Sequence, residues 1–113
     1  MIIKWYPEAI ADLQQIARYI DEQFGEKCCN TFLKEVMNVE KSICANPQIG
    51  KEEPLLKNQP ITYRSFVVAC KDKLVYRIDG DSVIVVAFWD CRRNPDALVK
   101  QITNHSPNEI NSL

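Results

Sequence analysis

Apolar residues recur every three or four positions through residues 7–45, which is the period of helices that bury one face. Pro7 favours a helix start, Gly25 favours an end, and Asn46-Pro47 favours a second end. Two helices are therefore predicted, and the short link between them folds them back as an antiparallel hairpin. Their apolar stripes are Ile10, Leu13, Ile16, Ala17, Ile20 and Phe24, followed by Cys29, Phe32, Val36, Val39 and Ile43.

The pattern turns to short strands on either side of this hairpin. Ile2–Lys4 predicts a strand that Pro7 closes, and Gly50–Pro60 has no period and predicts a loop. The segments after this loop are rich in Val, Ile, Tyr and Phe and are separated by turn residues, which predicts three consecutive antiparallel strands. These strands are Tyr63–Val68, Lys73–Ile78 and Val83–Trp89.

The order of these elements predicts an α+β fold. An N-terminal strand, an antiparallel helical hairpin packed on an antiparallel β-sheet, and a short helix over Asp96–Ile102 make one domain, residues 1–104, before a polar tail, residues 105–113. The segment Val83–Phe88 is apolar on both alternating faces, so its strand is expected at the centre of the sheet. The hairpin covers one face of the sheet, and the other face is expected to stay open.

Length and composition narrow the class of protein. The 113 residues suit one domain with a single core, and no apolar run approaches the roughly 20 residues of a membrane span. The amino terminus lacks the basic region and long apolar run of a secretory signal, so we expect a cytoplasmic protein with no membrane partner. The net charge of −1 excludes a global basic field, so any nucleic-acid contact must come from a local cluster.

The five cysteines favour neither a disulfide framework nor a metal site. Their number is odd and none has the C-x-x-C spacing, so we expect reduced thiols and neither metal nor cofactor. Adjacent Cys28 and Cys29 could form a redox-active pair. The alternative is that both are structural, with one thiol facing the core and the other at its edge.

A local cluster of basic residues lies on the second of the three consecutive strands, Lys73–Ile78. Lys73, Val75 and Arg77 share one face of that strand because side chains alternate, and Arg64 flanks them. A partner is expected to bind on this face. The same spacing is also typical of any solvated strand face, so the pattern alone leaves both interpretations open.

Three stretches of the chain resemble the RelE/ParE family of toxins. They are Tyr63-Arg64-Ser65, Lys73-Leu74-Val75-Tyr76-Arg77 and Trp89-Asp90-Cys91-Arg92-Arg93-Asn94-Pro95, and the resemblance covers roughly Ile3 to Ile102. It implies a toxin of a bacterial type II toxin–antitoxin pair, made beside an antitoxin that wraps it and masks its active face. RelE-like members cut messenger RNA in the decoding site of the ribosome, whereas ParE-like members poison DNA gyrase.

The resemblance also implies site residues. Along the shared Leu-Val-Tyr strand, Arg64, Lys73 and Arg92 fall on three basic positions of the RelE-like enzymes. Phe66 and Leu98 stand where those enzymes carry a further lysine and a tyrosine. The catalytic set is then Arg64, Lys73, Arg92 and Asp90, and the RNA-binding set is Lys71, Arg77 and Arg93.

RNA cleavage by a 2′-hydroxyl needs a base, cations for the charge that develops on phosphate, and an acid for the leaving oxygen. Arginine stays protonated, and lysine acts as a base only when its pKa is depressed. Asp90, where many relatives carry a histidine, is the acid–base candidate, and His105, the only histidine, falls in the tail. Arg92 and Arg93 could instead form structural pairs with Asp90 and Asp96.

Three hypotheses follow for function. The first is a toxin whose basic sheet face engages the ribosome and cleaves messenger RNA. The second is a ParE-like inhibitor of DNA gyrase that performs no chemistry, favoured by the missing tyrosine and by the low net charge. The third is an inactive relative that only binds its cognate antitoxin. The sequence leaves the choice among them open.

Overall fold

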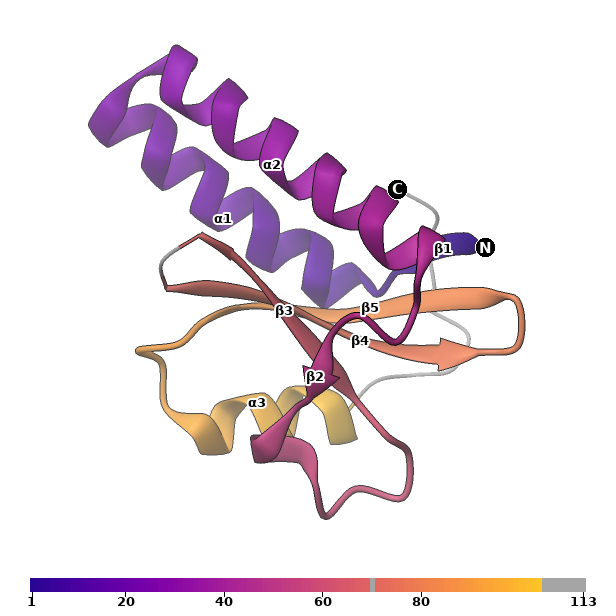
Figure 1. The fold of residues 1–113 in the computed structure, drawn as a ribbon. Coiled ribbons are helices and arrows are strands. Elements are labelled where there is room, and N and C mark those ends of the chain that lie inside the picture. Colours follow the sequence, from indigo (N-terminus) through magenta and orange to yellow (C-terminus); the bar gives the residue numbers. More distant parts are fainter. Residues whose placement is uncertain (70, 105–113) are drawn as a thin grey trace.

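Five strands form a single mixed sheet in the order β1-β5-β4-β3-β2, with helices on both faces (Figure 1). The computed structural model describes residues 1–69 and 71–104, so Cys70 and the predicted tail, residues 105–113, lie outside the described residues. The elements in chain order are β1 (Ile2–Trp5), α1 (Pro7–Phe24), α2 (Glu26–Ala45), β2 (Lys51–Glu52), the 3-10 helix η1 (Pro54–Leu56), β3 (Arg64–Ala69), β4 (Asp72–Asp79), β5 (Ser82–Asp90) and α3 (Pro95–Thr103).

The predicted helical hairpin is confirmed. α1 and α2 run antiparallel over one face of the sheet (Figure 1), and Gly25 at their junction has a φ of 92°, which glycine adopts without a steric penalty. Neither these helices nor α3 is long and apolar enough to cross a membrane. The residues that the hairpin buries are Ala9 and Leu13 of α1 and Phe32, Val36, Val39 and Ile43 of α2.

The predicted meander is confirmed as well, and two further strands complete the sheet. β3, β4 and β5 pair antiparallel in sequence order, and the short β2 pairs with β3. β1 pairs parallel with β5, from Ile2 opposite Ser82 to Trp5 opposite Val85. β5 therefore has a strand on each side, and its residues 83–89 are all buried, which agrees with the expected interior strand.

The expectation of an open second face was wrong. α3 lies on the face opposite the hairpin (Figure 1) and contacts both β5 and η1. Leu98 and Ile102 of α3 are buried, as are Val75 and Trp89, which alternate toward this face. The physical reason is that α3 has its own apolar side, which leaves water only by docking on the sheet.

The segment Gly50–Pro60 is also more ordered than the predicted loop, since it contains β2 and η1. The Glu53 carboxylate accepts a hydrogen bond from the Leu55 N–H at 3.0 Å, which caps η1. The Glu53 N–H donates to the Tyr63 carbonyl at 2.8 Å. Local hydrogen bonds rather than an apolar stripe hold this segment, so its sequence shows no period.

Candidate functional site

The predicted basic residues of the sheet lie on opposite faces. Cross-strand partners share a face, and Arg64 lies opposite Tyr76, whereas Lys73 lies opposite Val67. Since side chains alternate along β4, Lys73 and Arg77 lie on the face that α3 partly covers, and Arg64 lies on the hairpin face. The structure therefore does not bring Arg64 together with the other two.

Lys73 forms an ion pair with Glu53, and the two side chains are 12% and 0% exposed. Burial raises the pKa of the Glu53 carboxyl. Hydrogen bonds from Lys73, the Leu55 N–H and Ser65, together with the Lys73 charge, outweigh burial, so the pKa of Glu53 is lower than its ordinary value. The Lys73 ammonium is thus committed to a buried carboxylate of its own chain.

Arg64 holds the chain that follows α2. Its Nη1 donates to the Gly50 carbonyl at 2.8 Å. Nearby, the Tyr76 hydroxyl accepts a hydrogen bond from the Gly50 N–H at 3.0 Å and donates one to the Pro47 carbonyl at 2.6 Å. Burial raises the pKa of Tyr76, so its hydroxyl keeps the proton that it donates. These bonds fasten the end of the hairpin to the sheet.

The remaining predicted positions on the sheet and on α3 are packed. The side chain of Arg77 is 15% exposed, and its Nη1 lies 3.6 Å from Asp79 Oδ2. Phe66 is half-buried against the core, and Leu98 is fully buried. Phe66 and Leu98, the two positions at which the resemblance implies a lysine and a tyrosine in RelE-like enzymes, therefore serve packing in this chain.

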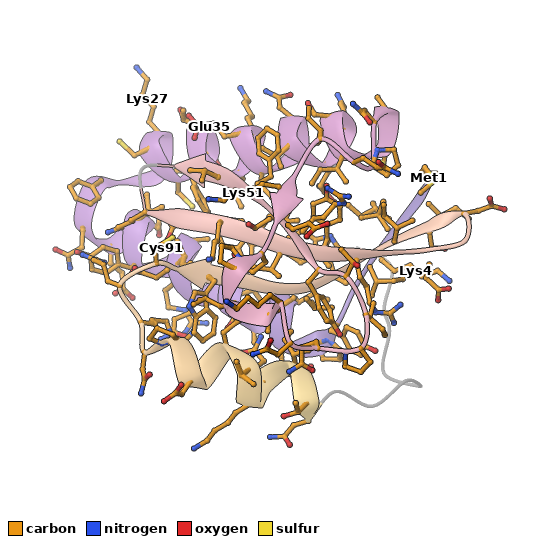
Figure 2. The ribbon with its side chains drawn as sticks, turned by 60° about the horizontal axis from the view of Figure 1, so that its bottom comes forward. Met1, Lys4, Lys27, Glu35, Lys51 and Cys91 are labelled. Atoms are coloured by element: carbon orange, nitrogen blue, oxygen red, sulfur yellow. The ribbon has the colours of Figure 1, made fainter. Side chains whose placement is uncertain are left out.

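Four predicted residues, Lys71, Asp90, Arg92 and Arg93, come together in a cleft of about 530 Å³ between α1 and the ends of β4 and β5. We call it the end cleft. Figure 2 shows Cys91 on the loop that leaves β5, at the same end of the molecule as Lys27 at the start of α2. The charged residues that line the end cleft are Asp12, Lys71, Asp72, Asp90, Arg92 and Arg93, and the apolar ones are Ile16, Tyr19, Ile20, Phe24 and Phe88.

Asp90 and Arg92 are joined by two side-chain hydrogen bonds, Nε to Oδ1 at 3.0 Å and Nη2 to Oδ2 at 2.7 Å. The Arg92 N–H also donates to Oδ1 at 2.9 Å. The side-chain bonds from Arg92, with its backbone bond and its charge, lower the pKa of Asp90 to about 2. A carboxylate with so low a pKa is a poor proton acceptor near neutral pH.

Asp72 lies opposite Asp90 in the sheet and is only 3% exposed. Burial, followed by the negative charge of Asp90, raises the pKa of the Asp72 carboxyl. Its Oδ1 has no hydrogen-bond partner among residues 1–69 and 71–104. Asp72, which is one of the residues that line the end cleft, thus carries a buried and unsatisfied acceptor.

The other two cations of the end cleft contact aromatic rings. The Arg93 guanidinium lies 3.9 Å from the centroid of the Trp89 ring, and its Nη1 lies 3.6 Å from Asp12 Oδ1. The Lys71 ammonium lies 5.8 Å from the centroid of the Tyr19 ring. Both geometries are those of cation–π pairs, so these cations are positioned by the chain itself.

Asp12 also accepts a backbone hydrogen bond from the edge of β5 in the part of the strand that does not pair with β1. The pairing with β1 stops at Val85. Beyond that point the Phe88 N–H donates to Asp12 Oδ2 at 3.2 Å, and Gln101 Nε2 donates to the same oxygen at 3.0 Å and to the Val86 carbonyl at 3.3 Å. Burial raises the pKa of Asp12 despite these bonds. Side chains of α1 and α3 therefore replace a neighbouring strand.

Sequence reasoning missed Asp12, Tyr19 and Asp72 as members of the site. Asp12 and Tyr19 lie outside the apolar stripe of α1, where the period does not separate them from solvated residues. Asp72 falls between two of the predicted strands, where the pattern indicates a turn. With these residues the end cleft has three cations and three carboxylates, which is no excess of positive charge for a phosphate. No three His, Cys, Asp or Glu side chains gather as a metal site in the described ranges.

Comparison with known proteins places the chain in a family. A family model described as the ParE toxin of type II toxin-antitoxin system, parDE, matches residues 3–95. This range contains the hairpin, all of the sheet except Ile2, and the charged end of β5. α3 begins at Pro95, where the match ends. No curated protein matches the sequence significantly.

Solved structures share the fold. A chain of the chromosomal ParDE system from P. aeruginosa is 18% identical with a TM-score of 0.63, over 80% of this chain and 95% of that one. A chain of the YoeB dimer from Staphylococcus aureus is 24% identical with a TM-score of 0.55, over 78% and 93%. The YoeB/ParE toxin from Agrobacterium tumefaciens is 18% identical with a TM-score of 0.57, over 80% and 98%. With the family model matching most of its length, this chain belongs to the ParE toxins of type II toxin–antitoxin systems.

Proposed function

We propose that this toxin arrests growth by binding DNA gyrase, without chemistry of its own. The observation that carries the proposal is the state of Asp90, the acid–base candidate. Both of its carboxylate oxygens accept hydrogen bonds from Arg92, and its pKa of about 2 makes it a weak base at neutral pH. A ribonuclease that attacks through a 2′-hydroxyl needs a group that accepts this proton.

The surroundings of the other proposed catalytic residues support the same conclusion. Lys73 pairs with the buried Glu53, and Arg64 donates to a backbone carbonyl on the opposite face of the sheet. Leu98, at the position of the tyrosine of RelE-like enzymes, is fully buried. A set of groups that are separated, paired and packed suits a scaffold for protein binding better than an RNA-cleaving centre.

A cognate antitoxin is the second partner in this proposal. The family is defined by type II toxin–antitoxin systems, and one structure of the same fold is a YoeB-YefM complex from Staphylococcus aureus, with a TM-score of 0.53. We propose that this chain likewise binds an antitoxin made beside it, which keeps it from its target. Gyrase and ribosomes are both cytoplasmic, so the proposal assigns the toxin to the cytoplasm.

Cleavage of messenger RNA on the ribosome is the other candidate function. The observation in its favour is that Lys71, Arg92 and Arg93 all reach one cleft. Cations grouped in this way stabilise the charge that develops on a phosphate. Each of them, however, has an acidic or aromatic neighbour within the chain, so RNA would have to displace those contacts.

The two functions are separated by inducing the toxin without an antitoxin. We expect growth to stop, double-strand breaks and the DNA-damage response to appear, and messages to stay whole. The purified chain is expected to inhibit supercoiling of relaxed plasmid by gyrase. Messages cut within their reading frames, with 2′,3′-cyclic or 3′-phosphate ends and undisturbed gyrase, would overturn the proposal in favour of the ribonuclease.

Two variants sharpen this test. Asp90→Asn removes the acid–base candidate, so it slows a ribonuclease by about a hundredfold or more but has no such effect on a gyrase inhibitor. Arg18→Ala, on an exposed position of α1 that does not line the end cleft, is the matched control. Normal growth with soluble, folded wild-type protein accumulating would contradict both functions.

A further inference from the structure

Asp72 gives the end cleft an acceptor that the fold does not use. The residue is 3% exposed, and its Oδ1 lacks a hydrogen-bond partner in the described part of the chain. Its neighbour across the strands, Asp90, has both oxygens bonded to Arg92. Asp12, the third carboxylate of the cleft, accepts from Phe88 and Gln101. Asp72 therefore differs from the two acids beside it.

An unsatisfied buried carboxylate is costly to a folded protein. The free-energy cost of desolvating the group is offset only when a hydrogen-bond donor reaches it, and a positively charged donor offsets the most. The Coulombic attraction of Asp72 to Lys71 and Arg92 offsets the cost only in part, because burial still raises the pKa of this carboxyl. A ligand that brings a cationic donor to Oδ1 would thus gain binding energy there.

The walls of the end cleft define the rest of such a ligand. Ile16, Ile20 and Phe88 present apolar surface beside the carboxylates. Arginine and lysine carry their charge on an aliphatic stem, which packs on apolar surface while the charged head reaches a polar group. Tyr19 and Phe24, which are 52% and 64% exposed, give flanking apolar residues of the same ligand a place to pack.

Charge also decides against an anionic occupant at this depth. Asp72 and Asp90 are cross-strand neighbours at the lining of the cleft, and Asp90 is paired with Arg92, so a phosphate that approached Oδ1 would meet the negative charge of Asp72, which has no hydrogen-bonded cation among the described residues. Polypeptides supply cationic side chains and nucleic acids do not. The complementary ligand is therefore a segment of a protein.

We propose that the end cleft receives one arginine or lysine side chain of a partner polypeptide, with its charged head on Asp72 and its stem against Ile16, Ile20 and Phe88. The proposal is independent of the choice between gyrase and the ribosome, because it concerns a contact of the isolated toxin. It predicts that a basic residue flanked by apolar ones is the recognised feature of that partner segment.

The test uses blocked tripeptides and the purified full chain, followed by amide chemical shifts in NMR. The probe is acetyl-Leu-Arg-Leu-amide, and its matched control replaces arginine with citrulline, which keeps the shape but loses the charge. We expect the arginine peptide to bind at least tenfold more tightly and to shift amides of residues 12–24, 71–72 and 88–93. Equal binding of the two peptides, shifts confined to other parts of the chain, or tighter binding of cytidine monophosphate would overturn the proposal.

Two variants assign the contact to Asp72. Asp72→Asn is nearly isosteric at an oxygen that makes no hydrogen bond, and it should remove the preference for arginine over citrulline. An unchanged preference in the folded variant would overturn the proposal. Lys71→Met removes a like charge from the rim and should tighten binding of the arginine peptide a few fold. If Asp72→Asn fails to fold, this second variant decides, and unchanged or weaker binding then counts against the proposal.

Discussion

At the scale of single residues, several of the predicted functional cations have acidic partners within the chain. Arg92 bonds to Asp90, Lys73 to Glu53 and Arg93 lies beside Asp12, so three predicted functional cations already have acidic neighbours. The sequence could suggest the first of these pairs because the residues are two positions apart. It could not suggest the other two, which join residues 20 or more positions apart through the tertiary fold.

The Asp90–Arg92 pair predicts a pH dependence of stability. The pKa of Asp90 is lowered from 3.8 to about 2 in the folded chain. Its stabilising contribution is therefore complete above about pH 4 and is lost as the pH falls towards 2. Asp90→Asn should flatten the pH dependence of the unfolding free energy in this window. At pH 7 the variant should be less stable than the wild type by the contribution of the pair, which is small because Arg92 is exposed, and the two proteins should become equal in stability as the pH falls towards 2. Urea unfolding at several pH values measures the unfolding free energy of the variant and of the wild type. The same pH dependence in the two proteins would contradict the low pKa of Asp90.

Asp12 yields a second prediction, because it accepts hydrogen bonds from both Phe88 and Gln101. Asp12→Leu leaves the Phe88 N–H without an acceptor and removes one of the two acceptors of Gln101, so it should cost about 1–3 kcal/mol in urea unfolding. Asp12→Asn keeps an acceptor oxygen and should cost clearly less. Burial raises the pKa of Asp12, so ionisation weakens the fold as the pH rises through that pKa, and Asn lacks this loss. Equal stability of the Leu variant and the wild type would show that the edge of β5 is satisfied in another way.

At the scale of elements, the apolar period predicted the hairpin and the meander because each of them buries a regular face. The short helix predicted over Asp96–Ile102 is confirmed as α3, but its packing on the sheet and the order within Gly50–Pro60 were not predicted. Hydrogen bonds of Glu53 hold Gly50–Pro60. α3 covers the sheet face that carries Lys73 and Arg77 of β4, and these two charged residues made that face look solvated in the sequence. A lysine that is neutralised by a buried carboxylate looks, in sequence, like a solvated one.

The close packing after α2 predicts that any side chain at Gly50 lowers the stability of the protein. A Cβ at this position would lie 2.6 Å from Tyr76 Oη and 2.8 Å from the Ser65 carbonyl oxygen. Gly50→Ala should therefore destabilise the protein more than Tyr76→Phe, which loses only the hydroxyl bonds and about 1–2 kcal/mol. The double variant should recover only part of the loss, because the Ser65 carbonyl remains in place. Thermal melts compare the three variants, and full recovery in the double variant would contradict the steric account.

The Lys73–Glu53 pair predicts that alanine substitution of Lys73 would be a misleading test of its role in toxicity. Lys73→Ala leaves the Glu53 carboxylate buried without its cation and should cost about 3 kcal/mol. Loss of toxicity in that variant would then report unfolding. Adding Glu53→Gln should restore much of the stability. If the single variant melts like the wild type, Lys73 is open enough to serve as a functional probe.

At the scale of the whole molecule, α3 completes the core although it lies beyond the matched family region. Leu98 and Ile102 are buried, and Gln101 bonds at the edge of β5. A chain that ends at residue 94 should lose this cover and expose Trp89, which is 1% exposed in the intact fold. Its tryptophan emission should shift to longer wavelength and its melting temperature should fall. Unchanged emission and melting would mean that α3 is an accessory to an already stable fold.

The parallel pairing of β1 with β5 has a consequence for the timing of synthesis. Ile2 pairs with Ser82 of β5, so the first strand to leave the ribosome stays unpaired until the last strand of the sheet has followed it. The end cleft likewise joins α1 to the chain around Asp90. A nascent chain therefore lacks both the complete sheet and the end cleft until β5 has been made. The interval before β5 emerges is time in which a partner protein can already be present when the sheet and the end cleft are completed.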